Sequence, residues 1–219
     1  LSQEGRIHVF PMKKDTFVWH RSSQENMTES ILNELEKFHN SHPYRPGMPK
    51  AEVHMRFMKQ VKPNVFDMYI EMLINEGKIG RSGEYLHAPA YEIPKDAVFE
   101  KASRTILETF EKAGYDFVRF SEIVFPKLPD GVKEDVLQVL ISDGTVVKIN
   151  DEMYTLASYM EKAKAKIIEK LQKDGLITIA EVRDMFGTSR KSAKPILEYM
   201  DSQKVTKKTG AESERVAYL

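Results

Sequence analysis

Apolar residues recur at helical spacing in three stretches of the chain, and each stretch leads into a short run rich in β-branched and aromatic residues. Apolar side chains three and four positions apart fall on one face of a helix, which is typical of a helix packed on a core. The pattern predicts three core-facing stripes, which are Phe66, Tyr69, Ile70 and Leu73; Val132, Val136, Val139 and Leu140; and Ala193, Ile196, Leu197 and Met200.

The β-rich runs share one arrangement, in which two short stretches flank polar turn residues. Such pairs are typical of β-hairpins. Four hairpins are predicted, with turns at Gly5, Gly77, Gly144 and Lys204 and, for the first, a tip at Lys13, Lys14 and Asp15. The four turns are 72, 67 and 60 residues apart, so the repeating unit is a small domain and is too long for a solenoid repeat.

Further helical segments precede three of the hairpins. Short helices are predicted over residues 50–58, 117–125 and 178–186, and longer ones over 28–40, 97–113 and 159–173. A helix, a short helix, a helix and a hairpin, in this order, make a winged helix-turn-helix domain. The predicted fold class is therefore mainly α with small β-hairpins (α+β), arranged as tandem winged helix-turn-helix domains in an elongated array.

The same repeat divides the chain into domains. Residues 1–20 hold a hairpin without helices, and we interpret them as the C-terminal wing remnant of a truncated winged-helix unit. Complete winged helices are predicted over residues 21–93, 94–157 and 158–219. Because the chain opens on Leu1 without Met, we expect it to be a fragment of a longer protein.

The composition is that of a globular protein and excludes several kinds of chemistry. Of 219 residues, 33 are Lys or Arg and 33 are Asp or Glu, so the formal net charge is zero. There is no cysteine, which excludes disulfides, Cys-ligated zinc and thiol catalysis. No apolar run is long enough to span a membrane, so we expect no membrane partner and a cytoplasmic location.

No motif for catalysis or for a metal stands out. The chain has neither a Gly-rich phosphate loop of the Walker type nor a Gly-x-Ser-x-Gly elbow. His39 and His42 are three apart, but Pro43 follows and no third ligand completes a zinc set nearby. We therefore expect no catalytic residue, no cofactor and no metal in this chain.

The neutral total hides an asymmetry. Residues 157–219 contain 13 basic and 9 acidic side chains, a net charge of +4, and residues 1–156 carry −4. The excess of positive charge lies in residues 186–210, which contain six basic and two acidic side chains. It surrounds the start of the third helix of the last winged helix, where residues 187–189 form a turn with hydroxyls suited to N-capping. An anion at that helix end would be bound by free N–H groups and two cations.

The alternative reading of these charges is a solvated basic face. Because helix start and wing lie side by side in a winged helix, we favour a nucleic-acid contact. The predicted nucleic-acid-binding residues, which the resemblance described below assigns to RNA, are Ser189, Arg190, Lys191, Lys194, Lys207, Lys208 and Arg215. The corresponding helices of the other units do not match, since the second unit offers Lys59, Lys62 and Asn64 and the third an acidic run at residues 130–135. Those units are interpreted as spacers or protein-contact modules. Pro195 should kink or shorten the recognition helix, which favours a bent backbone or a hairpin loop over a major groove.

Several motifs together resemble one family. The runs at residues 177–191, 195–201 and 205–210 are similar to the last winged helix of the bacterial selenocysteine-specific elongation factors of the SelB type. The run Phe38-His39-Asn40-Ser41-His42-Pro43-Tyr44-Arg45-Pro46-Gly47-Met48 resembles the start of another SelB repeat. The similarity covers most of the chain in order, although over residues 95–156 it is only architectural.

The resemblance implies a function for the whole arrangement. In the family, a GTPase domain binds GTP, Mg²⁺ and selenocysteyl-tRNA, and an arm of winged helices binds an mRNA hairpin beside a UGA codon on the ribosome. This chain would be that arm, a monomer without the GTPase domain. Its RNA grip would map to Ser189, Arg190, Lys191, Lys207 and Lys208. The wing at residues 210–215 departs from the family in being longer and in holding two added acids.

Two other hypotheses remain open from the sequence. A tandem winged-helix regulator of transcription would bind duplex DNA, usually as a symmetric dimer. A protein–protein scaffold with an incidental basic end would bind no nucleic acid at low salt.

Overall fold

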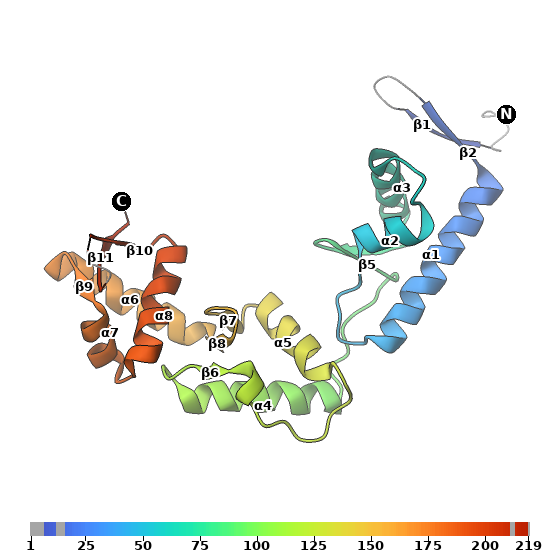
Figure 1. Ribbon diagram of the computed structural model, residues 1–219. Coiled ribbons are helices and arrows are strands. Elements are labelled where there is room, and N and C mark those ends of the chain that lie inside the picture. Colours follow the sequence, from blue (N-terminus) through green and yellow to red (C-terminus); the bar gives the residue numbers. More distant parts are fainter. Residues whose placement is uncertain (1–6, 12–15, 211–212, 219) are drawn as a thin grey trace. The chain divides into compact units, whose positions relative to one another are not determined.

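The computed structural model of the protein describes residues 7–11, 16–210 and 213–218. The chain divides into two compact units, residues 1–94 and 95–219. In both units helices alternate with small antiparallel sheets (Figure 1). The predicted fold class of helices with small β-hairpins in tandem winged helices is confirmed.

The N-terminal unit consists of a hairpin and one complete module, which we call the first winged helix (residues 21–87). Its elements are β1 (Ile7–Pro11), β2 (Thr16–His20), α1 (Arg21–Ser41), β3 (Met48–Pro49), α2 (Lys50–Phe57), α3 (Pro63–Asn75), β4 (Gly80–Ser82) and β5 (Tyr85–His87). The strands β1 and β2 pair antiparallel, and a second sheet has the order β3-β5-β4. The turn predicted at Gly5 and the hairpin tip predicted at 13–15 lie outside the described residues.

The leading hairpin belongs to the core of the first winged helix. The Trp19 ring on β2 lies 4.9 Å from the Tyr69 ring on α3, measured between centroids, and Phe10 on β1 is buried in the same cluster. The Tyr69 hydroxyl lies 2.7 Å from that of Thr28 on α1. The predicted stripe on α3 is confirmed, since Phe66, Tyr69, Ile70 and Leu73 are all buried.

The C-terminal unit contains two modules, the middle winged helix (residues 95–156) and the last winged helix (residues 157–218). The middle one has α4 (Ala97–Ala113), β6 (Val118–Arg119), η1 (Phe120–Glu122), α5 (Val132–Ser142), β7 (Val146–Lys148) and β8 (Met153–Leu156). The last one has α6 (Ala157–Asp174), β9 (Ile177–Thr178), α7 (Ile179–Phe186), α8 (Arg190–Ser202), β10 (Thr206–Lys208) and β11 (Glu214–Ala217). Their sheets have the orders β6-β8-β7 and β10-β11-β9.

The middle winged helix differs from the prediction in its second helix. The sequence predicted a short helix over residues 117–125, but the structure has the strand β6 and the three-residue 3-10 turn η1 instead. Pro126 and Pro129 follow this segment, and a residue before proline disfavours the helical conformation. The sequence pattern also did not predict the short third strand of the three-stranded sheets, which is β3, β6 or β9.

The two modules of the C-terminal unit share a hydrophobic core. The strand β8 ends at Leu156 and α6 begins at Ala157, so no linker separates them. Phe117 and Met153 of the middle winged helix are buried in one cluster with the apolar face of the last winged helix. The stripes predicted on α5 and α8 face the core as expected, except that Val139 is only partly buried. No helix in the described part of the chain is long and apolar enough to cross a bilayer.

His39 is buried at the end of α1 and holds the segment after β5. Its Nε2 atom accepts a hydrogen bond from the backbone N–H of Ala88 at 3.2 Å, and its ring stacks on Tyr91 with centroids 3.4 Å apart. Burial first, and then the nearby His87, lower the pKa of His39 from 6.5 to about 4. The geometry therefore requires a neutral imidazole that accepts at Nε2.

We predict that protonation of His39 destabilises the N-terminal unit. Because the folded pKa of about 4 lies below the unfolded value of 6.5, the unfolded chain binds more protons as the pH falls between these values. The free energy of unfolding should fall by about 3 kcal/mol over this window relative to a His39→Gln variant. Urea unfolding followed by the fluorescence of Trp19, the one tryptophan of the chain, reports this unit. Identical pH profiles of parent and variant would contradict the prediction.

Candidate nucleic-acid interface

The start of α8 presents cations to solvent. Ala193, Ile196 and Leu197 form its buried face, whereas the side chains of Arg190 and Lys191 in the first turn are exposed. Within the described residues, neither of these two cations forms an ion pair. They lie at the positive end of the helix dipole, where a negative ligand is favoured.

Two further features of α8 bear on the prediction. Lys194 is exposed as expected, but its ammonium group lies 3.7 Å from the carboxylate of Glu198 one turn later. Pro195 does not shorten the helix, which runs through it for 13 residues, as many as α3 has. The expectation of a shortened recognition helix is therefore wrong.

The wing adds two more exposed cations. Lys207 and Lys208 lie on β10, an edge strand of the sheet, and both side chains are exposed. Thr206, the first residue of β10, is buried, and its hydroxyl donates to Asp201 Oδ1 on α8 at 2.6 Å. This bond ties the wing to the helix. Arg190, Lys191, Lys207 and Lys208 therefore lie on two elements of one small module.

Arg215 does not belong to this surface, and its predicted role as an RNA contact is wrong. It lies on β11, the middle strand of the sheet, and its side chain is only 1% exposed. The Nε atom donates to Asp201 Oδ2 at 2.7 Å, and Nη1 donates to the Glu214 carbonyl at 3.1 Å. The guanidinium therefore fixes the wing from inside and cannot reach a phosphate.

The hydroxyl groups just before α8 do not cap the helix as the sequence predicted. Ser189 is the N-cap residue, but its side chain makes no capping hydrogen bond. Instead, the Thr188 hydroxyl donates to Asp116 Oδ1 at 2.5 Å, and the Ser189 N–H donates to the same oxygen at 3.1 Å. Asp116 belongs to the middle winged helix. Hydrogen bonds from Thr188 and then from the Ser189 backbone lower the pKa of Asp116, so it is ionised at neutral pH.

Lys204 occupies a backbone position that favours glycine. It follows α8 with a φ of +54°, and the equivalent turns of the other modules have Gly77 at +68° and Gly144 at +78°. The Val205 N–H donates to the Met200 carbonyl at 2.9 Å, which closes the helix end. An L-residue in this region is strained relative to glycine.

A stripe of exposed lysines, which the sequence pattern did not predict, runs along α6. Lys162, Lys166 and Lys173 are exposed and recur every four and seven residues along α6, which puts them on one face. The Lys166 ammonium lies 5.7 Å from the centre of the Phe186 ring. Lys170, on the same side, is paired with two carboxylates. The helical spacing of these lysines in the sequence could have predicted the stripe.

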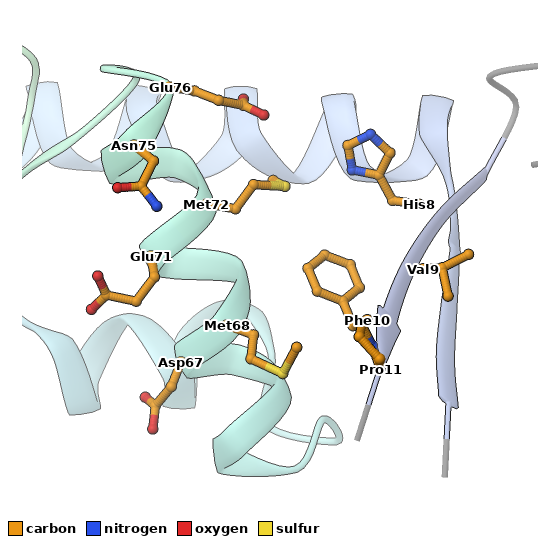
Figure 2. A pocket seen from close by; sticks show the side chains of 10 residues that line it. All are labelled: His8, Val9, Phe10, Pro11, Asp67, Met68, Glu71, Met72, Asn75 and Glu76. Carbon is orange, nitrogen blue, oxygen red and sulfur yellow. The ribbon is translucent and has the colours of Figure 1, made fainter. Parts of the chain in front are cut away.

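The first winged helix has a groove lined by acidic side chains along α3. A groove of about 700 Å³ runs between β1 and α3 (Figure 2). Its lining combines apolar side chains with the carboxylates of Asp67, Glu71 and Glu76. Each carboxylate pairs with a basic side chain of the same module, as Asp67 does with Lys50 at 3.3 Å. Each carboxylate of this groove is thus neutralised by a neighbouring base.

Two modules match known families. Residues 169–213 match a model described as "Elongation factor SelB, winged helix", and residues 32–87 match a second model with the same description. The selenocysteine-specific elongation factor of Desulfomicrobium baculatum is 24% identical over 190 residues, which are 85% of this chain and 30% of that protein. The factor of Haemophilus influenzae is 20% identical over 188 residues, again 85% and 30%. The chain thus spans about 30% of the length of these curated relatives.

A solved structure supports the winged-helix fold. A crystal structure of the bacterial selenocysteine-specific elongation factor EF-Sec is similar over 95% of this chain and 32% of its own, with 15% identity and a TM-score of 0.55. The mRNA-binding domain of E. coli SelB in complex with SECIS RNA covers 54% of this chain and 98% of its own, with 20% identity and a TM-score of 0.44. The resemblance to the winged-helix arm of SelB, found in the sequence, is confirmed.

We predict that Arg215 stabilises the last winged helix. Arg215→Ala removes one partner of a buried ion pair and should lower the free energy of unfolding by about 3 kcal/mol. Urea denaturation followed by circular dichroism measures the loss, and Lys207→Ala, an exposed cation of the same wing, should stay within about 0.5 kcal/mol of the parent. An Arg215→Ala chain as stable as the parent would return Arg215 to the list of surface contacts.

We also predict that Lys204→Gly stabilises the C-terminal unit. Relief of the left-handed conformation is partly offset by the greater freedom of glycine in the unfolded chain, which leaves a gain of roughly 0.5–1 kcal/mol. Lys204→Ala keeps the Cβ atom and removes the charge, so it controls for electrostatics and should give no such gain. Equal stabilisation by both variants would show that charge repulsion, not backbone strain, is relieved. Thermal unfolding measures both.

Proposed function

We propose that this chain is the mRNA-binding arm of a selenocysteine-specific translation elongation factor. The last winged helix would bind an mRNA hairpin, the selenocysteine insertion element, and so recruit the rest of the factor with selenocysteyl-tRNA to UGA codons. The observation that carries the proposal is the unpaired pair Arg190 and Lys191 at the start of α8, joined by Lys207 and Lys208 on the wing. This surface lies in a module that matches a SelB winged-helix model.

The proposed binding of RNA by these cations is electrostatic. The N–H groups at the start of a helix and neighbouring cations together favour a phosphate oxygen. Four cations that each neutralise one phosphate give a binding constant that falls steeply with salt, with a slope of about −0.7 to −0.9 per contact. Such contacts fix position and register but do not read sequence, so specificity requires unstacked bases in a loop or bulge.

The remaining partners belong to the longer factor. We expect GTP and Mg²⁺ to bind in a GTPase domain outside this chain, and the ribosome to be met through the assembled factor in the cytoplasm. This chain would act as a monomer and would contribute binding but no catalysis. The similarity of two modules to SelB models and of the chain to two selenocysteine-specific elongation factors supports this assignment.

A binding titration of the whole chain tests the proposal. The probes are a bulged hairpin taken from beside a UGA codon, a perfectly paired RNA hairpin and duplex DNA of equal length, each at two salt concentrations. We expect a preference for the bulged hairpin that survives the higher salt. Equal and salt-sensitive binding to all three probes would reduce the surface to a general polyanion patch, and a preference for duplex DNA would favour a transcriptional regulator.

We predict that Arg190→Ala and Lys191→Ala each weaken hairpin binding by about tenfold, because each removes one charge-assisted contact to phosphate. The salt slope should also become shallower by nearly one unit per variant. Lys59→Ala, which removes an exposed lysine just before α3 in the first winged helix, is the matched control and should leave both quantities unchanged. Parent-like binding by either α8 variant would exclude the helix start as the RNA contact.

A further inference from the structure

The middle winged helix holds the start of α8 at two points. On one side, Asp116 Oδ1 accepts hydrogen bonds from the Thr188 hydroxyl and the Ser189 N–H, and the Tyr115 carbonyl accepts from the same hydroxyl at 2.9 Å. Thr188 is buried. On the other side, the Phe117 N–H donates to the buried hydroxyl of Ser192 at 3.2 Å. Three consecutive residues of the middle winged helix therefore contact both ends of the first turn of α8.

Apolar contacts reinforce these hydrogen bonds. The Tyr115 ring lies 4.5 Å from the Phe186 ring at the end of α7, and its hydroxyl donates to the Tyr159 carbonyl at 3.3 Å. The Phe117 side chain is buried in the shared core of the two modules. The segment 115–117 is therefore anchored to α6, α7 and α8 at once.

Arg190 and Lys191 lie between the two anchored points, Ser189 and Ser192. We propose that Asp116 is a positioning residue for RNA binding, and that the middle winged helix is part of the RNA-binding apparatus rather than a spacer. The role rests on the proposed function of the chain. A binding site whose groups are already held in place loses less conformational freedom when the ligand arrives. A free first turn would have to be ordered by the RNA itself.

The carboxylate has a second, opposing effect. Asp116 is negatively charged and close to the helix start, so it also repels a phosphate placed there. Because Asp116 is exposed to solvent, water and salt screen this repulsion. The positioning effect and the repulsion predict opposite changes in affinity when Asp116 is replaced, which makes the two separable by experiment.

Two replacements of Asp116, made in the whole chain, separate the positioning effect from the repulsion. Asp116→Asn keeps an oxygen that can accept from Thr188 and Ser189, whereas Asp116→Ala removes it. We expect Asp116→Ala to weaken binding of the bulged RNA hairpin by about tenfold and Asp116→Asn to remain within about threefold of the parent. The salt slope should stay unchanged in both, because no phosphate contact is lost, in contrast to Arg190→Ala. Asp130→Ala, an exposed acid of the same module, is the matched control.

A second variant and a second readout protect the test against misfolding. Thr188→Val keeps the buried volume and removes the donor to Asp116, so it should weaken binding and be non-additive with Asp116→Ala. Amide hydrogen exchange at residues 189–193 should accelerate in Asp116→Ala and not in Asp116→Asn, without RNA present. This measurement reports the anchor itself.

The outcomes are distinguishable. Tighter binding by both Asp116 variants would show that repulsion dominates and would overturn the positioning role. Parent-like binding and exchange in Asp116→Ala would return the middle winged helix to the status of a spacer. A parent chain that does not bind the hairpin would overturn the proposed function and the role in RNA binding together, whereas a binding parent with an unaffected Asp116→Ala overturns the positioning role alone.

Discussion

The last winged helix depends on a core that it does not complete alone. Phe117 and Met153 from the middle winged helix are buried with the apolar faces of α6 and α8. A module of about 60 residues buries only about 60% of the surface that its unfolded chain exposes and is marginally stable by itself, so a shared core adds to its stability. Since α6 begins at the residue after β8, no linker residues lie between the two modules. The position of the basic helix is therefore set by two modules together.

Charge is distributed along the chain in a way that the net value of zero conceals. In the last winged helix, the wing cations and the first turn of α8 are exposed, whereas Arg215 is buried against Asp201. In the first winged helix, the equivalent helix α3 has carboxylates, each paired within its own module. One fold thus carries exposed cations in one copy and a neutralised acidic surface in another. The fold alone does not determine which kind of surface charge a module carries.

The sequence predicted most of the fold because apolar spacing and turn residues are local signals. The stripe from Phe66 to Leu73 is buried as its periodicity required, and α4 has the predicted bounds. The site was predicted less completely. Arg215 looked like its neighbours in charge, and only the pairing of β11 with strands on both sides reveals that it is buried. Asp116 lies more than 70 residues from Thr188 and Ser189, so no local pattern could connect them.

The start of α8 combines features that weaken an isolated helix. Arg190 and Lys191, which form no ion pair with any described residue, oppose the helix dipole, and the N-cap side chain makes no capping bond. Asp116, whose carboxylate is bound there, belongs to another module, and its Oδ1 atom accepts from both Thr188 and Ser189. Natural chains tolerate such local conflicts where a function requires them. A phosphate beside Arg190 and Lys191 would add to the negative charge that Asp116 already brings, so the features that would weaken this helix start in isolation are also those that favour an anion there.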